Sequence, residues 1–195
     1  CGKVPPTLLG NAMSDSAFDR LSVLLVDDNR FMRGVLHTLL QAFGVHRIYD
    51  AGDGSEALQR LRNTPVDLVI CDSDTKPMDG LALTRSLRAD PDRTKTMLPV
   101  LLLSGHDDER QAATARDAGV TEILGKPLSP RDLYLCLLAA LESPRPFVQT
   151  EGYRGPSRRR QTQAFAGSDR RAAARPAQTP VNLGQLSALI EELAS

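Results

Sequence analysis

The 195-residue sequence contains no tryptophan, and aromatic residues make up only 4% of it. No segment approaches the ~18 consecutive apolar residues of a membrane-spanning helix, so the sequence predicts no membrane span. The three cysteines, Cys1, Cys71 and Cys136, lack the paired spacing of a metal site. Cys71 and Cys136 lie within apolar runs, as small core residues do. That usage suits a reducing compartment, so we expect a cytoplasmic protein.

The chain has no net charge, but its charges are unevenly distributed. Residues 145–175 contain eight arginines and only two acids, Glu151 and Asp169. Because basic and acidic residues are equally numerous in the whole chain, the remainder is acidic. An acidic body with a basic segment suggests two different partners.

The sequence begins with Cys1 rather than methionine. A mature bacterial lipoprotein also begins with cysteine, but no signal peptide supports that interpretation. We therefore expect Met13 to be the natural start, and residues 1–19 to be a disordered leader.

Short strand-like segments alternate with helical periodicity between residues 20 and 142. The predicted strands are 22–26, 47–51, 67–72, 99–103 and 121–124. The predicted helices are 30–43, 54–61, 80–87, 107–118 and 130–141. Regular alternation of this kind predicts parallel strands joined by right-handed crossovers. The expected fold class is therefore α/β, with a doubly wound five-stranded parallel sheet.

Polar side chains follow four of these strands. They are Asp27 and Asp28, Asp72, Ser104, and Lys126. Each has an ordinary explanation when taken alone, such as a loop cap for Asp72. The carboxyl ends of parallel strands meet at one edge of the sheet, so together they predict a site. Clustered carboxylates need a neutralising cation, and carboxylates with a backbone carbonyl and waters suit Mg²⁺.

These positions resemble the signature of the bacterial response-regulator receiver domain, the CheY-like family with a flavodoxin-like fold. The residues that carry the resemblance are Asp27-Asp28, Asp72, Asp79-Gly80, Ser104 and Lys126-Pro127. The resemblance covers residues 20–142. It implies a signalling module of a two-component phosphorelay, not an enzyme with an external substrate.

The resemblance also implies a role for each site residue. Asp72 would accept a phosphoryl group from a sensor histidine kinase and become an aspartyl phosphate. Lys126 would neutralise charge on the phosphoryl oxygens, and Ser104 would sense the bound group. The implied Mg²⁺ ligands are Asp27 through water, Asp28, Asp72 and the Asp74 carbonyl. Such a phosphoprotein assists only its own phosphotransfer and dephosphorylation.

Two departures from the family pattern stand near this site. The family has Met-Pro three and four residues after the phosphoacceptor, whereas this chain has Thr75-Lys76. The family's switch aromatic is replaced by Ile123. The loop beside Asp72 is therefore expected to differ in shape, and Ile123 is open to interpretation as plain strand packing.

Residues 143–181 are rich in proline, arginine, glycine, serine and alanine, which predicts a disordered tail. The pattern aromatic-x-Gly-x-x-Arg-Arg occurs twice in it, starting at Tyr153 and at Phe165. One interpretation is a solvated basic linker. The other is a nucleotide site, since aromatic rings and guanidinium groups stack on bases and arginine also pairs with guanine and phosphate.

The tail resembles the arginine-rich segment of CheY-like cyclic-di-GMP effectors of alphaproteobacteria, which act at the flagellar motor. The residues that would bind this ligand are Tyr153, Arg158, Arg159, Phe165, Asp169, Arg170 and Arg171. Residues 182–195 are expected to form a short amphipathic helix, which docks either on the receiver or in a partner's groove.

The sequence contains no helix-turn-helix pattern, so no DNA-binding domain is expected. The primary functional hypothesis is a single-domain response regulator that signals through protein contacts in chemotaxis or motility, with the flagellar motor as one such target. The alternative is a cyclic-di-GMP-binding adaptor whose receiver is a docking module.

Overall fold

The protein is described by a computed structural model, which covers residues 18–105, 109–142, 145–150 and 152–158. The chain divides into two units, Cys1–Pro156 and Ser157–Ser195. The predicted terminal helix at 182–195 lies outside the described residues. Within the described ranges, no helix is both long and apolar enough to cross a membrane.

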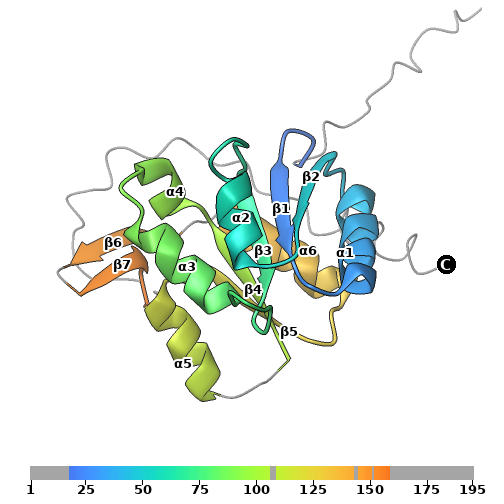
Figure 1. Cartoon of the computed structure of the whole chain (residues 1–195). Coiled ribbons are helices and arrows are strands. Elements are labelled where there is room, and N and C mark those ends of the chain that lie inside the picture. Colours follow the sequence, from blue (N-terminus) through green and yellow to red (C-terminus); the bar gives the residue numbers. More distant parts are fainter. Residues whose placement is uncertain (1–17, 106–108, 143–144, 151, 159–195) are drawn as a thin grey trace, which may run out of the picture. The chain divides into compact units, whose positions relative to one another are not determined.

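A five-stranded parallel sheet lies at the centre of the first unit (Figure 1). Its strands are β1 (Ser22–Val26), β2 (Arg47–Ala51), β3 (Leu68–Asp72), β4 (Val100–Ser104) and β5 (Glu122–Gly125). They are ordered β2-β1-β3-β4-β5, and every adjacent pair is parallel. The predicted doubly wound α/β fold is therefore confirmed.

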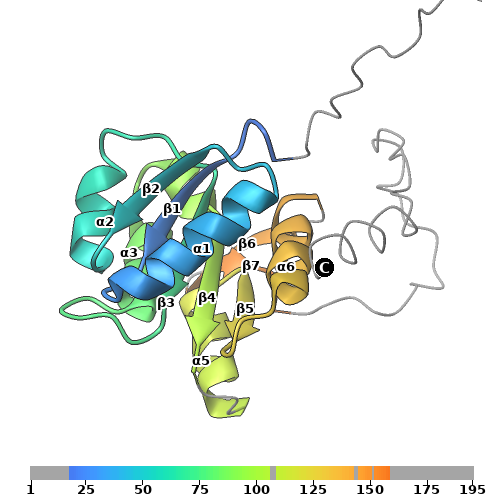
Figure 2. The same ribbon diagram turned by 90° about the vertical axis from the view of Figure 1, so that its right-hand side faces the viewer.

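Helices follow the strands and cover both faces of the sheet (Figure 2). They are α1 (Arg30–Ala42), α2 (Gly54–Arg60), α3 (Gly80–Ala89), α4 (Arg93–Met97), α5 (Glu109–Ala118) and α6 (Pro130–Glu142). Asn29, Asp53, Asp79 and Asp92 cap the first four. Each cap side chain accepts a hydrogen bond from a first-turn amide that has no helical partner. The short α4 was not predicted, because five residues do not show a helical period.

Alternate residues of each strand enter two separate cores, because successive side chains of a strand point to opposite faces. In β1, Val23 and Leu25 pack with α1 and α6, whereas Leu24 and Val26 pack with α2, α3 and α5. The same division holds in β3 and β4. Burial on both faces explains why these strands are nearly continuous apolar runs.

The predicted C-terminal boundary of the leader, at residue 19, is wrong. Phe18 is only 2% exposed and packs edge-on against Tyr134 of α6, with ring centroids 5.5 Å apart. Asp19 lies 3.6 Å from a ring nitrogen of His46. An aromatic ring before β1 completes the core on the α1–α6 face, so the folded unit begins before residue 20.

The prediction of a disordered segment from residue 143 is also wrong over residues 147–156. There the chain forms an antiparallel hairpin of β6 (Phe147–Thr150) and β7 (Tyr153–Pro156). The hairpin packs near α3 and α4, and the Phe147 ring lies 5.8 Å from the Arg88 guanidinium. Its composition is that of a linker, but its docking on the receiver supplies the burial that an isolated hairpin lacks.

Candidate functional site

The register of the sheet brings four predicted site residues to one edge. Val26 of β1 is opposite Cys71 of β3, so Asp27 and Asp72 are the next residues on neighbouring strands. Ser104 ends β4 and is opposite Gly125 of β5. The Lys126 amide then donates to the Ser104 carbonyl at 2.7 Å. The carboxyl ends of β1, β3, β4 and β5 therefore meet as the sequence predicts.

Asp72 and Lys126 form an ion pair at the centre of this edge. The Lys126 Nζ lies 3.0 Å from Asp72 Oδ1, and the two side chains are 25% and 11% exposed. The contact is close in distance but does not have the angles of a hydrogen bond. Asp72 Oδ1 therefore keeps a lone pair that a further group can use.

Asp27 is almost fully buried beside this pair. Its Oδ1 accepts a hydrogen bond of 2.7 Å from the Asn29 amide, and its Oδ2 has no hydrogen-bond partner within the described part of the chain. Burial raises the pKa of Asp27, as do the charges of Asp72 and Asp28, against the lowering effects of the Asn29 amide and Lys126. A cation at this edge would relieve the crowding of negative charge.

The four predicted Mg²⁺ ligands are placed differently. Asp27 and Asp72 are buried, whereas the side chains of Asp28 and Asp74 are exposed. Within the described ranges, no group of three or more acidic, histidine or cysteine side chains is close enough to hold a metal ion by itself. Mg²⁺ commonly takes one or two carboxylates and keeps several waters, so the Asp27 and Asp72 oxygens fit it. The full ligand set stays a prediction.

Ser104 makes a contact that sequence reasoning missed. Its hydroxyl donates to the Gln111 Oε1 of α5 at 3.1 Å, and Ser104 is 3% exposed. Gln111 follows Ser104 by seven residues, across a loop, and no local pattern distinguishes it from an ordinary helical glutamine. The hydrogen bond links the end of β4 to α5.

Comparisons with known proteins agree with this geometry. The family model described as "Response regulator receiver domain" matches residues 23–137. The chain belongs to the response-regulator receiver family. The predicted resemblance over residues 20–142 is thereby confirmed at the level of the family.

Relatives of this receiver domain include chemotaxis proteins. The chain is 32% identical over 113 residues to the chemotaxis protein CheY-3 of Vibrio cholerae, covering 58% of this chain and 85% of that protein. It is 35% identical over 119 residues to a protein-glutamate methylesterase/protein-glutamine glutaminase of Paramagnetospirillum magneticum. That match covers 60% of this chain and only 30% of the longer relative.

The fold is also that of a solved chemotaxis response regulator. The solved structure of the chemotaxis response regulator CheY4 of Vibrio cholerae matches with a TM-score of 0.57 and 27% sequence identity. The match covers 62% of this chain and 98% of CheY4.

The departures in the receiver loop have a structural consequence. Thr75, which stands where the family has methionine, is 2% exposed and donates its hydroxyl to the Met78 carbonyl at 2.9 Å. The Met78 carbonyl also accepts from the Gly54 amide at 3.0 Å. Lys76 is exposed, and Ile123 packs against the core on the α2–α3 face. The loop is thus tied to the start of α2, and Ile123 acts as strand packing.

Only two of the predicted tail ligands, Tyr153 and Arg158, lie within the described residues. Tyr153 belongs to the hairpin, where its hydroxyl donates to the Pro156 carbonyl at 2.6 Å. Arg158 is exposed. The remaining five lie outside the described residues; they are Arg159, Phe165, Asp169, Arg170 and Arg171.

Proposed function

We propose that this protein is a single-domain response regulator that accepts a phosphoryl group on Asp72 from a sensor histidine kinase and signals through protein contacts. The observation that carries the proposal is the Asp72–Lys126 pair, 3.0 Å apart, beside the buried Asp27. The chemotaxis relative favours an output in cell movement. The proposal includes a cytoplasmic location, where the kinase would act.

In the proposed reaction, an Asp72 carboxylate oxygen attacks the phosphorus, and the phosphorus–nitrogen bond to the donor histidine breaks. The histidine keeps the bonding electrons and takes a proton. Lys126 is already paired with Asp72, so its ammonium group is placed to neutralise the phosphoryl oxygens as they approach. The product is a carboxyl phosphate that biases a two-state equilibrium of the domain.

Receiver domains bind Mg²⁺ in their active site, and the residues here fit that ion. The ion would supply positive charge to the phosphoryl oxygens. Asp28 and Asp72 would hold it directly, with Asp27 through water and the Asp74 carbonyl as a further ligand. The Asn29 amide keeps Asp27 Oδ1 occupied and so leaves Oδ2 for a bound water.

Acetyl phosphate provides a direct test of this function. The full chain, incubated with acetyl phosphate and Mg²⁺, should gain the mass of one phosphoryl group by intact mass spectrometry. Chelation of Mg²⁺ should remove most of the adduct. A chain that gains no adduct under conditions that modify a known response regulator would contradict the proposal.

A variant of Gln111 tests whether Ser104 donates a hydrogen bond to the bound phosphoryl group. Ser104 must leave Gln111 Oε1 before it can donate to a phosphoryl oxygen. Because a hydrogen bond of this kind contributes about 0.5–1.5 kcal/mol, Gln111→Ala should strengthen beryllofluoride binding by about two- to tenfold. Amide chemical shifts, titrated with beryllofluoride and Mg²⁺, provide the measurement. Gln41→Ala, on the exposed side of α1, is the matched control. Unchanged or weaker binding in Gln111→Ala would show that the contact does not restrain Ser104.

The second candidate function is a cyclic-di-GMP-binding adaptor. It rests on the repeated aromatic-Gly-Arg-Arg pattern and on the exposure of Arg158 in its first copy. Tyr153, from the same copy, is a structural residue of the hairpin, so the first copy would contribute its arginines more than its ring.

Combined substitution Arg158→Ala and Arg170→Ala should abolish cyclic-di-GMP binding and leave the phosphoryl adduct unchanged. Arginine pairing with phosphate and guanine would carry most of the affinity, which should also fall with salt. Calorimetry with cyclic di-GMP, GMP and a short RNA measures the binding of each ligand. Arg62→Ala with Arg131→Ala, at two exposed arginines of the receiver, is the control. Equal heats for the three ligands would indicate a generic polyanion-binding segment instead.

A further inference from the structure

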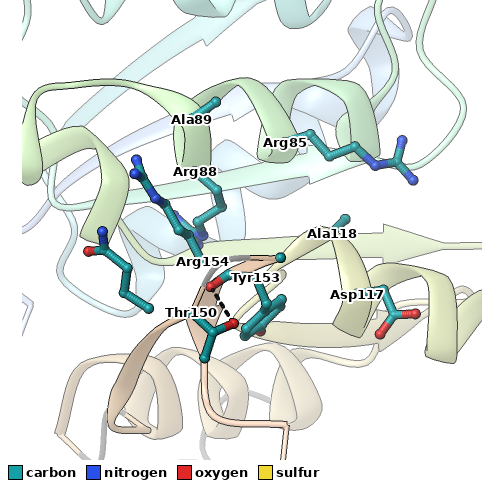
Figure 3. A pocket seen from close by; sticks show the side chains of 10 residues that line it. Arg85, Arg88, Ala89, Asp117, Ala118, Thr150, Tyr153 and Arg154 are labelled. Atoms are coloured by element: carbon teal, nitrogen blue, oxygen red, sulfur yellow. Dashed lines mark hydrogen bonds between the residues drawn. The ribbon is translucent and has the colours of Figure 1, made fainter.

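A polar hollow lies where the β6–β7 hairpin meets α3 and the end of α5 (Figure 3). Its volume is about 700 Å³. The residues that give it its charge and shape are Arg85 and Arg88 of α3, Asp117 of α5, and Gln149, Tyr153 and Arg154 of the hairpin. We refer to it as the hairpin hollow. Neither the family match at residues 23–137 nor the phosphoacceptor chemistry accounts for it.

The hairpin hollow is at the opposite edge of the sheet from Asp72. Arg88 donates to the carbonyls of Thr96, Leu98 and Gly119, which precede the amino ends of β4 and β5. Asp72, in contrast, ends β3 at the carboxyl edge. A ligand in the hairpin hollow is therefore separate from the phosphoacceptor site.

Close backbone contacts hold the hairpin against this edge. A Cβ on Gly119, which has a positive φ of 89°, would approach the Arg154 carbonyl to 2.9 Å. A Cβ on Gly155 would lie 2.9 Å from the Gly119 Cα. The Tyr153 hydroxyl is fixed on the Pro156 carbonyl, so its ring is a defined wall of the hairpin hollow. The backbone of the hairpin, the Tyr153 ring and the buried Arg88 are thus fixed by the fold, whereas Arg85, Gln149 and Arg154 are exposed side chains around them.

The donors of Arg88 are only partly used. A guanidinium group has five N–H donors. One at Nε bonds to Gly119, and those at Nη1 bond to Thr96 and Leu98. The whole Arg88 residue is only 4% exposed. Its Nη2 atom is buried and has no hydrogen-bond partner within the described residues. Buried donors without partners are unfavourable, so a further acceptor at Nη2 would stabilise Arg88.

The charge of the hairpin hollow points to an anion. Burial lowers the pKa of Arg88 to about 10, so the group remains charged at neutral pH. Arg85 and Arg154 add two more positive charges at the rim, and Asp117 is the one carboxylate among the described lining residues. Among the described residues, no carboxylate lies within salt-bridge distance of Arg88. A buried cation without a counter-ion is costly unless an anion supplies one.

We propose that the hairpin hollow binds a phosphate ester of a small molecule, with the phosphate between Arg88 and Arg154. Guanidinium groups match phosphate oxygens with paired, charge-assisted hydrogen bonds. The volume exceeds what a phosphate alone needs and falls in the range of small-molecule sites. The exposed part of the Tyr153 ring and the Gln149 side chain would contact the rest of the ester.

Nuclear magnetic resonance titration of the full chain tests the site residue by residue. The probes are inorganic phosphate and AMP, which separate a bare phosphate from an ester. The readouts are the amide signals of Gly152, which lines the hairpin hollow, and of Gly119 and Gly155, which follow lining residues in the sequence. These signals report on the hairpin hollow independently of the arginines beyond residue 156. Both probes should shift these signals, and AMP should bind about tenfold more tightly than phosphate.

Variants show whether the arginines of the hairpin hollow are responsible for AMP binding. Arg154→Gln should weaken AMP binding at these amides by about tenfold, whereas Arg154→Lys should retain part of it. Arg131→Gln on α6 and Asp72→Asn should leave it unchanged. Shifts that are absent, or an equal loss in Arg131→Gln, would overturn the proposal. Phosphate and AMP binding with the same affinity would overturn its assignment to an ester.

Discussion

Asp72→Asn is expected to abolish the phosphoryl adduct formed with acetyl phosphate and Mg²⁺. The amide has nearly the same volume, so the buried position stays filled, but it lacks the negative charge and the nucleophilic oxygen. It also loses the ion pair with Lys126 Nζ at 3.0 Å. Intact mass spectrometry should therefore show no adduct in this variant.

Asp74→Asn is the matched control for this result. Asp74 lies two residues further along, its side chain is exposed, and only its backbone carbonyl is proposed to contact the ion. The adduct should persist in Asp74→Asn. If Asp72→Asn still gained a phosphoryl group, Asp72 would not be the acceptor.

The Asp72→Asn variant also separates the two candidate functions in the cell. A response regulator should lose its output in Asp72→Asn, whereas a cyclic-di-GMP adaptor should keep it and lose it when the arginine-rich segment is removed. The deletion should begin at residue 157. One that begins at residue 145 would also remove Phe147 from the Arg88 guanidinium and Arg145 from Glu122, and so would disturb the receiver itself.

Gly80→Ala is expected to destabilise the fold by about 2–3 kcal/mol, at the upper end of what overpacking usually does. A Cβ on Gly80 would approach the Asp72 carbonyl to 2.5 Å, Leu102 Cδ1 to 2.7 Å and Cys71 Sγ to 2.9 Å. The nearest of these atoms is backbone in a central strand and cannot move aside cheaply. Urea denaturation provides the measurement, and the adduct should also form more slowly because the strain falls on Asp72.

Gly34→Ala is the contrasting variant. Gly34 is within α1, and a Cβ there would have no atom within 4 Å. Alanine should therefore raise the free energy of unfolding by about 0.5–1 kcal/mol, through helix propensity alone. Equal effects at Gly34 and Gly80 would mean that the contacts around Gly80 do not restrict its side chain.

Elements of this fold are predictable from the sequence where local pattern and tertiary environment agree. The strands 22–26 and 47–51 were predicted with the observed bounds, and the other three within one residue at each end. Central parallel strands are buried on both faces, so their apolar runs are visible in the sequence. Asp72, Ser104 and Lys126 were predictable because each directly ends or follows such a run.

The missed features depend on contacts between distant residues. The hairpin has four-residue strands without a clear apolar alternation. It contacts Gly119 and Arg88, which are far from it in the sequence, and Arg145, just before it, pairs with Glu122. The Ser104–Gln111 hydrogen bond likewise depends on how α5 lies against β4. Phe18 belongs to the core because Tyr134 is beside it, which nothing near residue 18 indicates.

The hairpin also changes which segment of this protein could be transferred as a complete receiver domain. Domains are exchanged between proteins at points where few contacts cross the cut. The family match ends at residue 137. A transferred segment that ended there would lack Phe147, whose ring lies against the Arg88 guanidinium, and Arg145, which pairs with Glu122. For recombination, whether by evolution or in a chimera, the smallest transferable unit of this protein runs from Phe18 to Pro156.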